Sequence, residues 1–160
     1  MKVGREGSLG RFECTAMDEP KGQGGYEAFE HTADVGLRVW GGSLSELFEQ
    51  AAAGFISVLV DPNSAHPGRI VNVKITGGSP EELLVGWLQE ILFAFDAEGF
   101  VPKEVRVVSV GENEVTGQLL GEDLDLSRHR LRQAVKAVTY SDLAIRESDG
   151  RYEVRIVFDV

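Results

Sequence analysis

The sequence is poor in cysteine and in basic residues, and it has no long hydrophobic run. Cys14 is the single cysteine among 160 residues, so an internal disulfide and a cysteine-rich zinc site are excluded. No uncharged apolar stretch of about 18 residues is present, and the N-terminus lacks the apolar block of a secretory signal. We therefore expect a cytoplasmic protein without a membrane partner.

The shortage of basic residues also restricts the partners of this chain. Lys and Arg total 16 and Asp and Glu total 26, which gives a formal net charge of −10. Non-specific binding to nucleic acid depends on Lys and Arg displacing counterions from phosphates. We therefore expect no strong direct binding of RNA or DNA.

The charge is not spread over the whole chain. Within residues 1–24 the basic and acidic residues cancel, glycines recur and no apolar period appears, so residues 1–25 are predicted to be a disordered leader or extension. Residues 26–160 carry the net charge. With 42% apolar residues in the chain, they are enough for one domain with one core.

Two amphipathic helices are predicted. The first follows Ser43, which forms a capping box with Glu46, and its apolar residues recur at helical spacing down to Leu59. The second has Ser79 as N-cap and Pro80 at the first helical position, and its apolar stripe runs to Phe95. Gly99 is expected to end it.

The remaining regular segments have the two-residue period of strands. They are residues 35–40, 69–76, 103–110, 115–120, 134–145 and 152–160, and a polar loop is expected at 121–132. The order is strand, helix, strand, helix and then four strands. This order predicts an α+β fold, a two-layer α/β sandwich in which two main helices pack on a mainly antiparallel sheet.

The common catalytic signatures are absent from the sequence. It has no phosphate-binding loop, no nucleophile elbow, no H-E-x-x-H motif and no dinucleotide fingerprint. His66 and His129 fall in polar loops and are interpreted as solvated residues. His31 differs, because it stands three residues before Asp34 at a strand entry and directly after Glu30. The alternative for this group is a turn capped by side-chain oxygens.

The C-terminal end supplies two further oxygen donors. The last strand stops at Asp159 and Val160, so an aspartate lies beside a free α-carboxylate. If a neighbouring strand brings Asp34 alongside, three carboxylates converge, and oxygen-only ligation selects Ca²⁺, Mg²⁺ or Mn²⁺. The alternative is a frayed, exposed terminus. Lys136, in an apolar strand-like run, either points to solvent or pairs with this acidic group.

Four segments together resemble the archease family. They are YEAFEHTADVGLRVWG, SLSELFEQAAAGFISVLVD, VKAVTYSDL and the terminal VRIVFDV, and the resemblance covers residues 26–160. It implies an α/β sandwich and a non-enzymatic protein that activates the RtcB-type RNA ligase of tRNA splicing. The activator is expected to promote ligase guanylylation and multiple turnover.

The resemblance also implies a divalent-cation site. It assigns Asp34, Asp159 and the carboxylate of Val160 as metal ligands, with Lys136, Glu30 and His31 as supporting or partner-contacting residues. Gly42 stands where some members have an acidic residue, and Ser141 where many have histidine. Two alternatives remain open: a metal-dependent phosphohydrolase, and a chaperone-like interaction module that needs no metal.

Overall fold

The computed structural model of this chain describes residues 24–31 and 34–160. The predicted leader therefore lies almost entirely outside the described residues. The helices and strands are β1 (Gly25–His31), β2 (Asp34–Gly41), α1 (Leu44–Leu59), η1 (Pro62–Ser64), β3 (Arg69–Thr76), α2 (Pro80–Asp96), β4 (Phe100–Val110), β5 (Glu114–Asp123), β6 (Ala137–Val138), β7 (Arg146–Ser148) and β8 (Arg151–Asp159).

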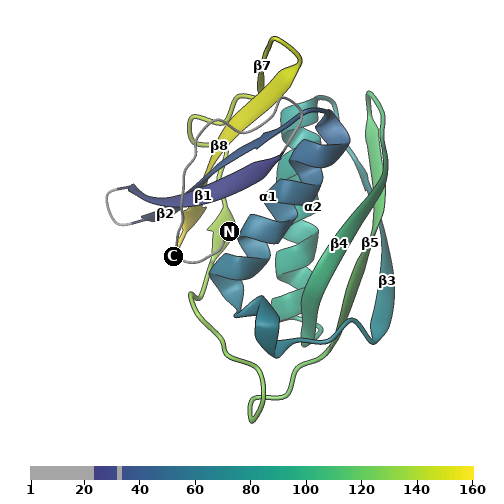
Figure 1. The fold of residues 1–160 in the computed structure, drawn as a ribbon, viewed down its shortest axis with the longest axis vertical. Coiled ribbons are helices and arrows are strands. Elements are labelled where there is room, and N and C mark those ends of the chain that lie inside the picture. The colour runs from purple at the N-terminus through teal and green to yellow at the C-terminus, as the bar shows by residue number, and fades with distance from the viewer. Residues whose placement is uncertain (1–23, 32–33) are drawn as a thin grey trace.

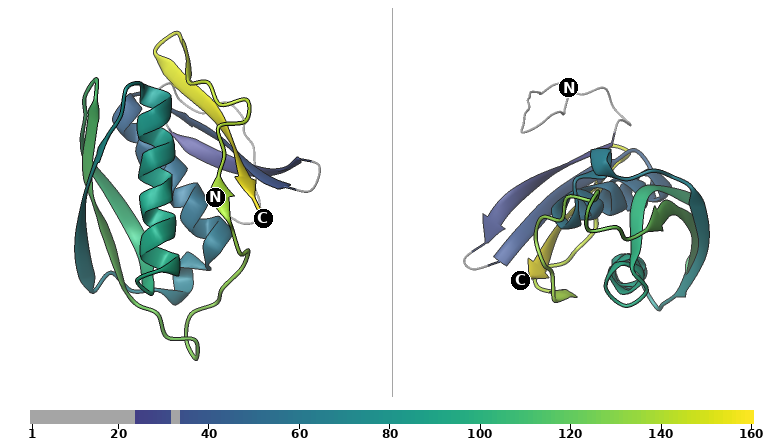
Figure 2. Two further views of the ribbon diagram at one scale, coloured as in Figure 1. Left: turned by 180° about the vertical axis from the view of Figure 1, so that it is seen from behind. Right: turned by 90° about the horizontal axis from the view of Figure 1, so that it is seen from below.

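The strands form two antiparallel sheets with both long helices between them (Figures 1 and 2). One sheet has the order β1-β2-β8-β6, with β7 also paired to β8, and the other has the order β3-β5-β4. Every strand pair is antiparallel. The predicted α+β class is confirmed, and the structure adds that the antiparallel strands are divided between two sheets.

Both helices begin where the capping residues predict. The Oγ of Ser43 accepts a hydrogen bond from the Glu46 N–H (3.1 Å), and the Oγ of Ser79 accepts one from the Glu82 N–H (3.1 Å). These side chains satisfy amide groups that have no partner inside the helix. Helix α2 ends at Asp96, and Gly99 then adopts a φ of +63°, which glycine tolerates without a Cβ clash.

The core lies where the apolar faces of the helices meet the sheets. Trp87 of α2 is fully buried, and its indole Nε1–H donates to the carbonyl oxygen of Phe48 in α1 over 3.2 Å. The ring of Phe55 stacks on that of Phe158 in β8 at 4.7 Å between centroids. Helix α1 is therefore anchored both to α2 and to the five-stranded sheet, which fixes the end of β8 in space.

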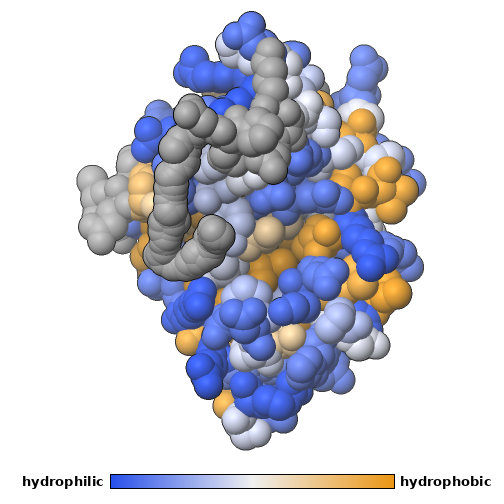
Figure 3. Space-filling model, in the orientation of Figure 1, coloured by the Kyte–Doolittle hydropathy of each residue, from blue (hydrophilic) through white to orange (hydrophobic). Residues whose placement is uncertain are grey.

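One face of the molecule is mostly polar. Figure 3 shows hydrophilic residues over much of this face, with hydrophobic residues gathered beside the helices and toward the three-stranded sheet. Val108 on β4 is an exposed hydrophobic residue, with 69% of its surface accessible. No helix among the described residues has the length and apolar character needed to cross a membrane.

The predicted strand at residues 134–145 is wrong over most of its length. Only Ala137–Val138 pair with β8, after which the chain turns: the Leu143 N–H donates to the Tyr140 carbonyl (3.1 Å) and Asp142 has a φ of 55°. The Ile145 N–H is then bound by a carboxylate oxygen of Glu81 in α2 (3.0 Å). A tertiary contact therefore replaces the ladder hydrogen bonds that the apolar alternation predicts.

Two further boundaries differ from the prediction. Residues 25–31, for which the sequence predicts no strand, form the edge strand β1, and its residues pair in register with β2. Strand β5 continues to Asp123, so the polar loop predicted from Gly121 begins at Leu124. In both places pairing with a neighbouring strand extends the regular structure beyond the local sequence signal.

Candidate functional site

The five-stranded sheet brings the two predicted acidic segments to one corner. Strand β2 begins at Asp34 and the antiparallel β8 ends at Asp159. Val35 pairs with Phe158, so the same register continued by one residue sets Asp34 opposite Asp159. Residues opposite each other in an antiparallel pair project to the same face, which puts both aspartates on one face of the sheet.

Lys136 and the chain terminus lie at the same corner. The backbone N–H of Lys136 donates to the carbonyl oxygen of Asp159 over 2.7 Å, and the next residue, Ala137, pairs with Asp159 in the β6–β8 ladder. The Lys136 side chain is exposed. Ser141, five positions further on, lies in the turn that leaves the sheet. The structure therefore brings the backbone of Lys136, Asp159 and Val160 together.

Glu30 and His31 form the end of β1 beside this corner. In the β1–β2 register Glu30 pairs with Val35 and His31 with Asp34. The side chains of Glu30 and His31, together with residues 32–33, lie outside the described part of the structure. The supporting or partner-contacting role of Glu30 and His31 therefore stays a prediction.

The donor set of this corner is two aspartates and one terminal carboxylate. Asp159 is exposed and Asp34 half-buried. Among the described residues no group of three or more His, Cys, Asp and Glu side chains is arranged to hold a metal ion. The predicted set counts the α-carboxylate of Val160 as its third donor. A set made only of carboxylate oxygens fits a hard divalent cation better than zinc.

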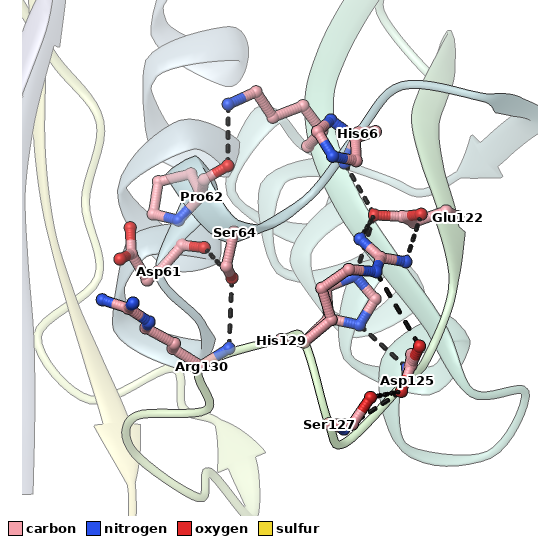
Figure 4. A network of polar contacts seen from close by, with 11 residues as sticks. Asp61, Pro62, Ser64, His66, Glu122, Asp125, Ser127, His129 and Arg130 are labelled. Carbon is pink, nitrogen blue, oxygen red and sulfur yellow. Dashed lines mark hydrogen bonds and ion pairs between the residues drawn. The ribbon is translucent and has the colours of Figure 1, made fainter.

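A second group of charged residues lies at the far end of the helices and is shown in Figure 4. The carboxylate of Glu122 accepts two hydrogen bonds from the Arg128 guanidinium (2.8 and 2.9 Å) and one from the His66 backbone N–H (2.8 Å). The ring of His129 bridges Glu122 and the Asp125 backbone. We refer to Glu122, Arg128 and His129 as the Glu122 clamp.

Local geometry fixes the tautomer of His129. Its Nδ1 accepts from the Asp125 backbone N–H (2.9 Å), so the ring proton of the neutral side chain is on Nε2, which donates to Glu122 over 2.9 Å. The imidazole is completely buried. The interpretation of His129 as a solvated loop residue is therefore wrong, whereas His66 is exposed as predicted.

Charge pairing within the clamp shifts two pKa values. The hydrogen bonds from Arg128, and then that from His129, hold the pKa of Glu122 far below the ordinary glutamate range. In return, the carboxylate of Glu122 raises the pKa of Arg128. The clamp joins residues 124–130 to β5 and to the loop after η1. Because its charged groups are already matched, we interpret it as structural.

A third group of charged residues lines a cleft of about 1150 Å³ on the outer face of the five-stranded sheet. Arg38 of β2, Arg146 of β7, and Arg151 and Arg155 of β8 contribute to its lining, as does Phe29 of β1. We call this feature the arginine cleft. No motif singles out these arginines. The one available sequence signal is the alternation of Arg151, Glu153 and Arg155, which puts three charged residues on one side of a strand.

The fold defines a small α+β protein whose acidic corner combines residues from both ends of the domain. Comparisons with known proteins identify its family. The Archease protein family (MTH1598/TM1083) matches residues 26–160. The protein archease of Aeropyrum pernix is 38% identical over 141 residues, covering 86% of this chain and 98% of the relative. That of Sulfurisphaera tokodaii is 35% identical over 137 residues, covering 84% and 98%. The chain belongs to the archease family.

Solved structures share the fold. The solution structure of Methanobacterium thermoautotrophicum protein 1598 has a TM-score of 0.71 and 31% identity, covering 85% of this chain and 99% of that protein. A crystal structure from Thermotoga maritima, described as an archease and possible chaperone, has a TM-score of 0.62 and 19% identity, covering 92% and 100%. At that identity the second likeness shows the fold alone.

Proposed function

We propose that this protein is a non-enzymatic, metal-binding activator of an RtcB-type RNA ligase in tRNA splicing. It promotes ligase guanylylation and allows multiple turnover. Membership of the archease family supports the role, and the register that sets Asp34 opposite Asp159 supports the metal site. The register is the observation that carries the proposal, because it unites residues that are 125 positions apart (159 − 34).

The residues at the acidic corner have separate roles in this proposal. The carboxylates of Asp34 and Asp159 and the α-carboxylate of Val160 hold a divalent cation, either Ca²⁺, Mg²⁺ or Mn²⁺. When bound, such an ion supplies positive charge that can orient phosphate oxygens. The exposed Lys136 contacts a phosphate or the ligase surface, while Glu30 and His31 border the same corner. The acidic protein meets a basic ligase, which itself holds the RNA.

Aspartate-to-asparagine variants test the proposal. Asp34→Asn and Asp159→Asn preserve side-chain shape but remove charge, so each is expected to abolish stimulation of guanylylation of a purified RtcB-type ligase with the fold unchanged. Asp123→Asn is the matched control, since this exposed aspartate lies on β5 in the other sheet. Full stimulation by both test variants would refute the proposal.

The contribution of the terminal carboxylate can be tested separately. Adding a few residues after Val160 moves the free carboxylate away, which is expected to weaken Ca²⁺, Mg²⁺ or Mn²⁺ binding in calorimetric titrations. Unchanged affinity would show that the terminal carboxylate is not a ligand. The titration needs no ligase, so it reports on the metal site alone.

Two other functions predict different results in these experiments. A metal-dependent phosphohydrolase would use the carboxylates to activate water, and the isolated protein would then turn over phosphate esters. A chaperone-like module would keep its effect on the ligase in the presence of a chelator. Our proposal requires that the isolated protein has no hydrolytic turnover and that chelation removes the stimulation.

A further inference from the structure

The arginine cleft is formed on the sheet face that points away from the helices. In β2 and β8, residues such as Leu37 and Ile156 alternate with the cleft residues and are fully buried against the core. The intervening positions face outward, and in this register Arg38 pairs with Arg155, while Glu153 pairs with Arg146 of β7. The arginines therefore lie side by side on a rigid sheet.

Aromatic rings support three of these guanidinium groups. Arg155 lies over the Phe29 ring at 4.3 Å, and Arg38 and Arg151 lie over the Trp40 ring at 4.8 and 5.5 Å. The absence of a Cβ at Gly36 makes room for Phe29, because a Cβ there would lie 2.3 Å from the ring. A guanidinium stacked by its face keeps its N–H edge available for a second partner.

The four arginines that line the cleft exceed by one its three lining carboxylates, which belong to Asp142, Asp149 and Glu153. Arg38 is bound to Glu153 (2.8 Å) and approaches Glu27. Among the side chains that the structure describes, Arg146, Arg151 and Arg155 form no ion pair, and the Nε–H of Arg151 is buried without a hydrogen-bond partner. A buried donor without a partner is unfavourable, and because the Arg151 side chain as a whole is only half-buried, its guanidinium can meet an external acceptor.

We propose that the arginine cleft binds a phosphate-bearing ligand of nucleotide size. Guanidinium edges match phosphate oxygens in bidentate geometry, and a cleft of about 1150 Å³ is large enough for a nucleotide. The hydroxyls of Ser141 and Ser148 and the carboxylates of Asp142 and Asp149 also line it. These groups can accept hydrogen bonds from hydroxyl or amino groups of a nucleotide.

The net charge of −10 limits the ligand to a compact one. Screening at physiological ionic strength acts over about 8 Å, so the cleft can attract a phosphate at short range while the remaining surface repels a long polyanion. The residues that line this cleft do not include Asp34, Asp159 or Val160 of the acidic corner. Ligand binding in the cleft requires neither the bound cation nor the ligase of the proposed function.

Calorimetric titration tests this site on the full chain with a chelator present. A nucleoside 5′-monophosphate is expected to bind saturably, while its unphosphorylated nucleoside is not. Arg151→Gln and Arg155→Gln should each weaken binding about tenfold or more, because each removes charge-assisted hydrogen bonds. Arg106→Gln is the matched control: this exposed arginine lies on β4 of the other sheet, and its variant should bind normally.

Other ligands and a conservative variant sharpen the test. Arg155→Lys keeps the charge but loses the planar fork, so it should bind nearly as weakly as Arg155→Gln. Pyrophosphate and a 5′-phosphorylated oligonucleotide should both bind more weakly than the nucleotide. The proposal would be overturned if the nucleotide did not bind saturably, or if Arg106→Gln weakened nucleotide binding as much as the cleft variants do. It would also be overturned if Arg155→Lys bound the nucleotide with wild-type affinity. Tighter binding of pyrophosphate, the oligonucleotide or a synthetic acidic peptide than of the nucleotide would have the same consequence.

Discussion

The Glu122 clamp and the arginine cleft use the same types of residue in opposite ways. In the clamp, Arg128 is committed to the carboxylate of Glu122, which also binds the His129 ring and a backbone N–H. In the cleft, Arg151 and Arg155 lie on aromatic rings and have no carboxylate partner among the described residues. Charges that the fold has matched stabilise it, whereas charges that it has left unmatched are available to a ligand.

The largest expected effect in this comparison is on the buried member of the clamp. His129→Ala leaves the Asp125 N–H without its acceptor and opens a cavity, so the free energy of unfolding should fall by about 2 to 3 kcal/mol. Urea unfolding followed by circular dichroism measures the change. His66→Ala, at an exposed loop position, should change stability by less than about 0.5 kcal/mol. Equal stability of the two variants would contradict the structural role of His129.

A smaller, pH-dependent effect is expected at Glu122. Folding lowers its pKa from the ordinary value of 4.5, so the folded state favours the ionised carboxylate. The resulting stabilisation is fully present above the unfolded-state pKa and is lost as pH falls below it toward the lower folded-state pKa. Glu122→Gln should lower the melting temperature at pH 7, and the difference from the original protein should shrink below pH 4.5.

Thermal unfolding between pH 7 and pH 3 measures that difference. Glu147→Gln is a suitable control, because this exposed glutamate lies on β7 away from the clamp. A constant gap between Glu122→Gln and the original protein over the whole pH range would show that the charge of Glu122 does not stabilise the fold.

The smallest expected effect is on the stability of the cleft variants. Arg155→Gln removes an exposed side chain whose stacking on the Phe29 ring contributes at most about 1 kcal/mol, so the free energy of unfolding should fall by no more than about that amount. Arg128→Gln should lower the melting temperature more, because it removes the main partner of Glu122. A larger fall in melting temperature for Arg155→Gln than for Arg128→Gln would contradict the distinction between the arginine cleft and the Glu122 clamp.

Much of the local structure follows from short sequence signals. Ser43 and Ser79 predict both helix starts because an N-cap depends on residues within one turn. The strand at residues 69–76 is also correct to the residue, since its alternation and the glycines after it are local features. Asp34 and Asp159 could be singled out as oxygen donors from their motifs, although the functional assignment still rests on the proposal above.

Other features depend on contacts that the local sequence does not contain. The apolar alternation of residues 134–145 predicts a strand, yet Glu81 of α2 binds the Ile145 amide and the chain turns at Asp142. The polar neighbours of His129 predict a solvated side chain, yet Glu122 and the Asp125 amide enclose it. In both cases a hydrogen bond formed in the folded chain, and not the local sequence pattern, decides the structure.

Signals within the sequence account for the α+β class, the starts of both helices, the net charge of −10 and the motifs that carry the family resemblance. Contacts made in the folded chain set Asp34 opposite Asp159 in the continued β2–β8 register, bury His129, and line one cleft with arginines from β2, β7 and β8. The physical reason is that caps and periodicity act within a few residues. Strand register and charge pairing instead join segments that are far apart along the chain.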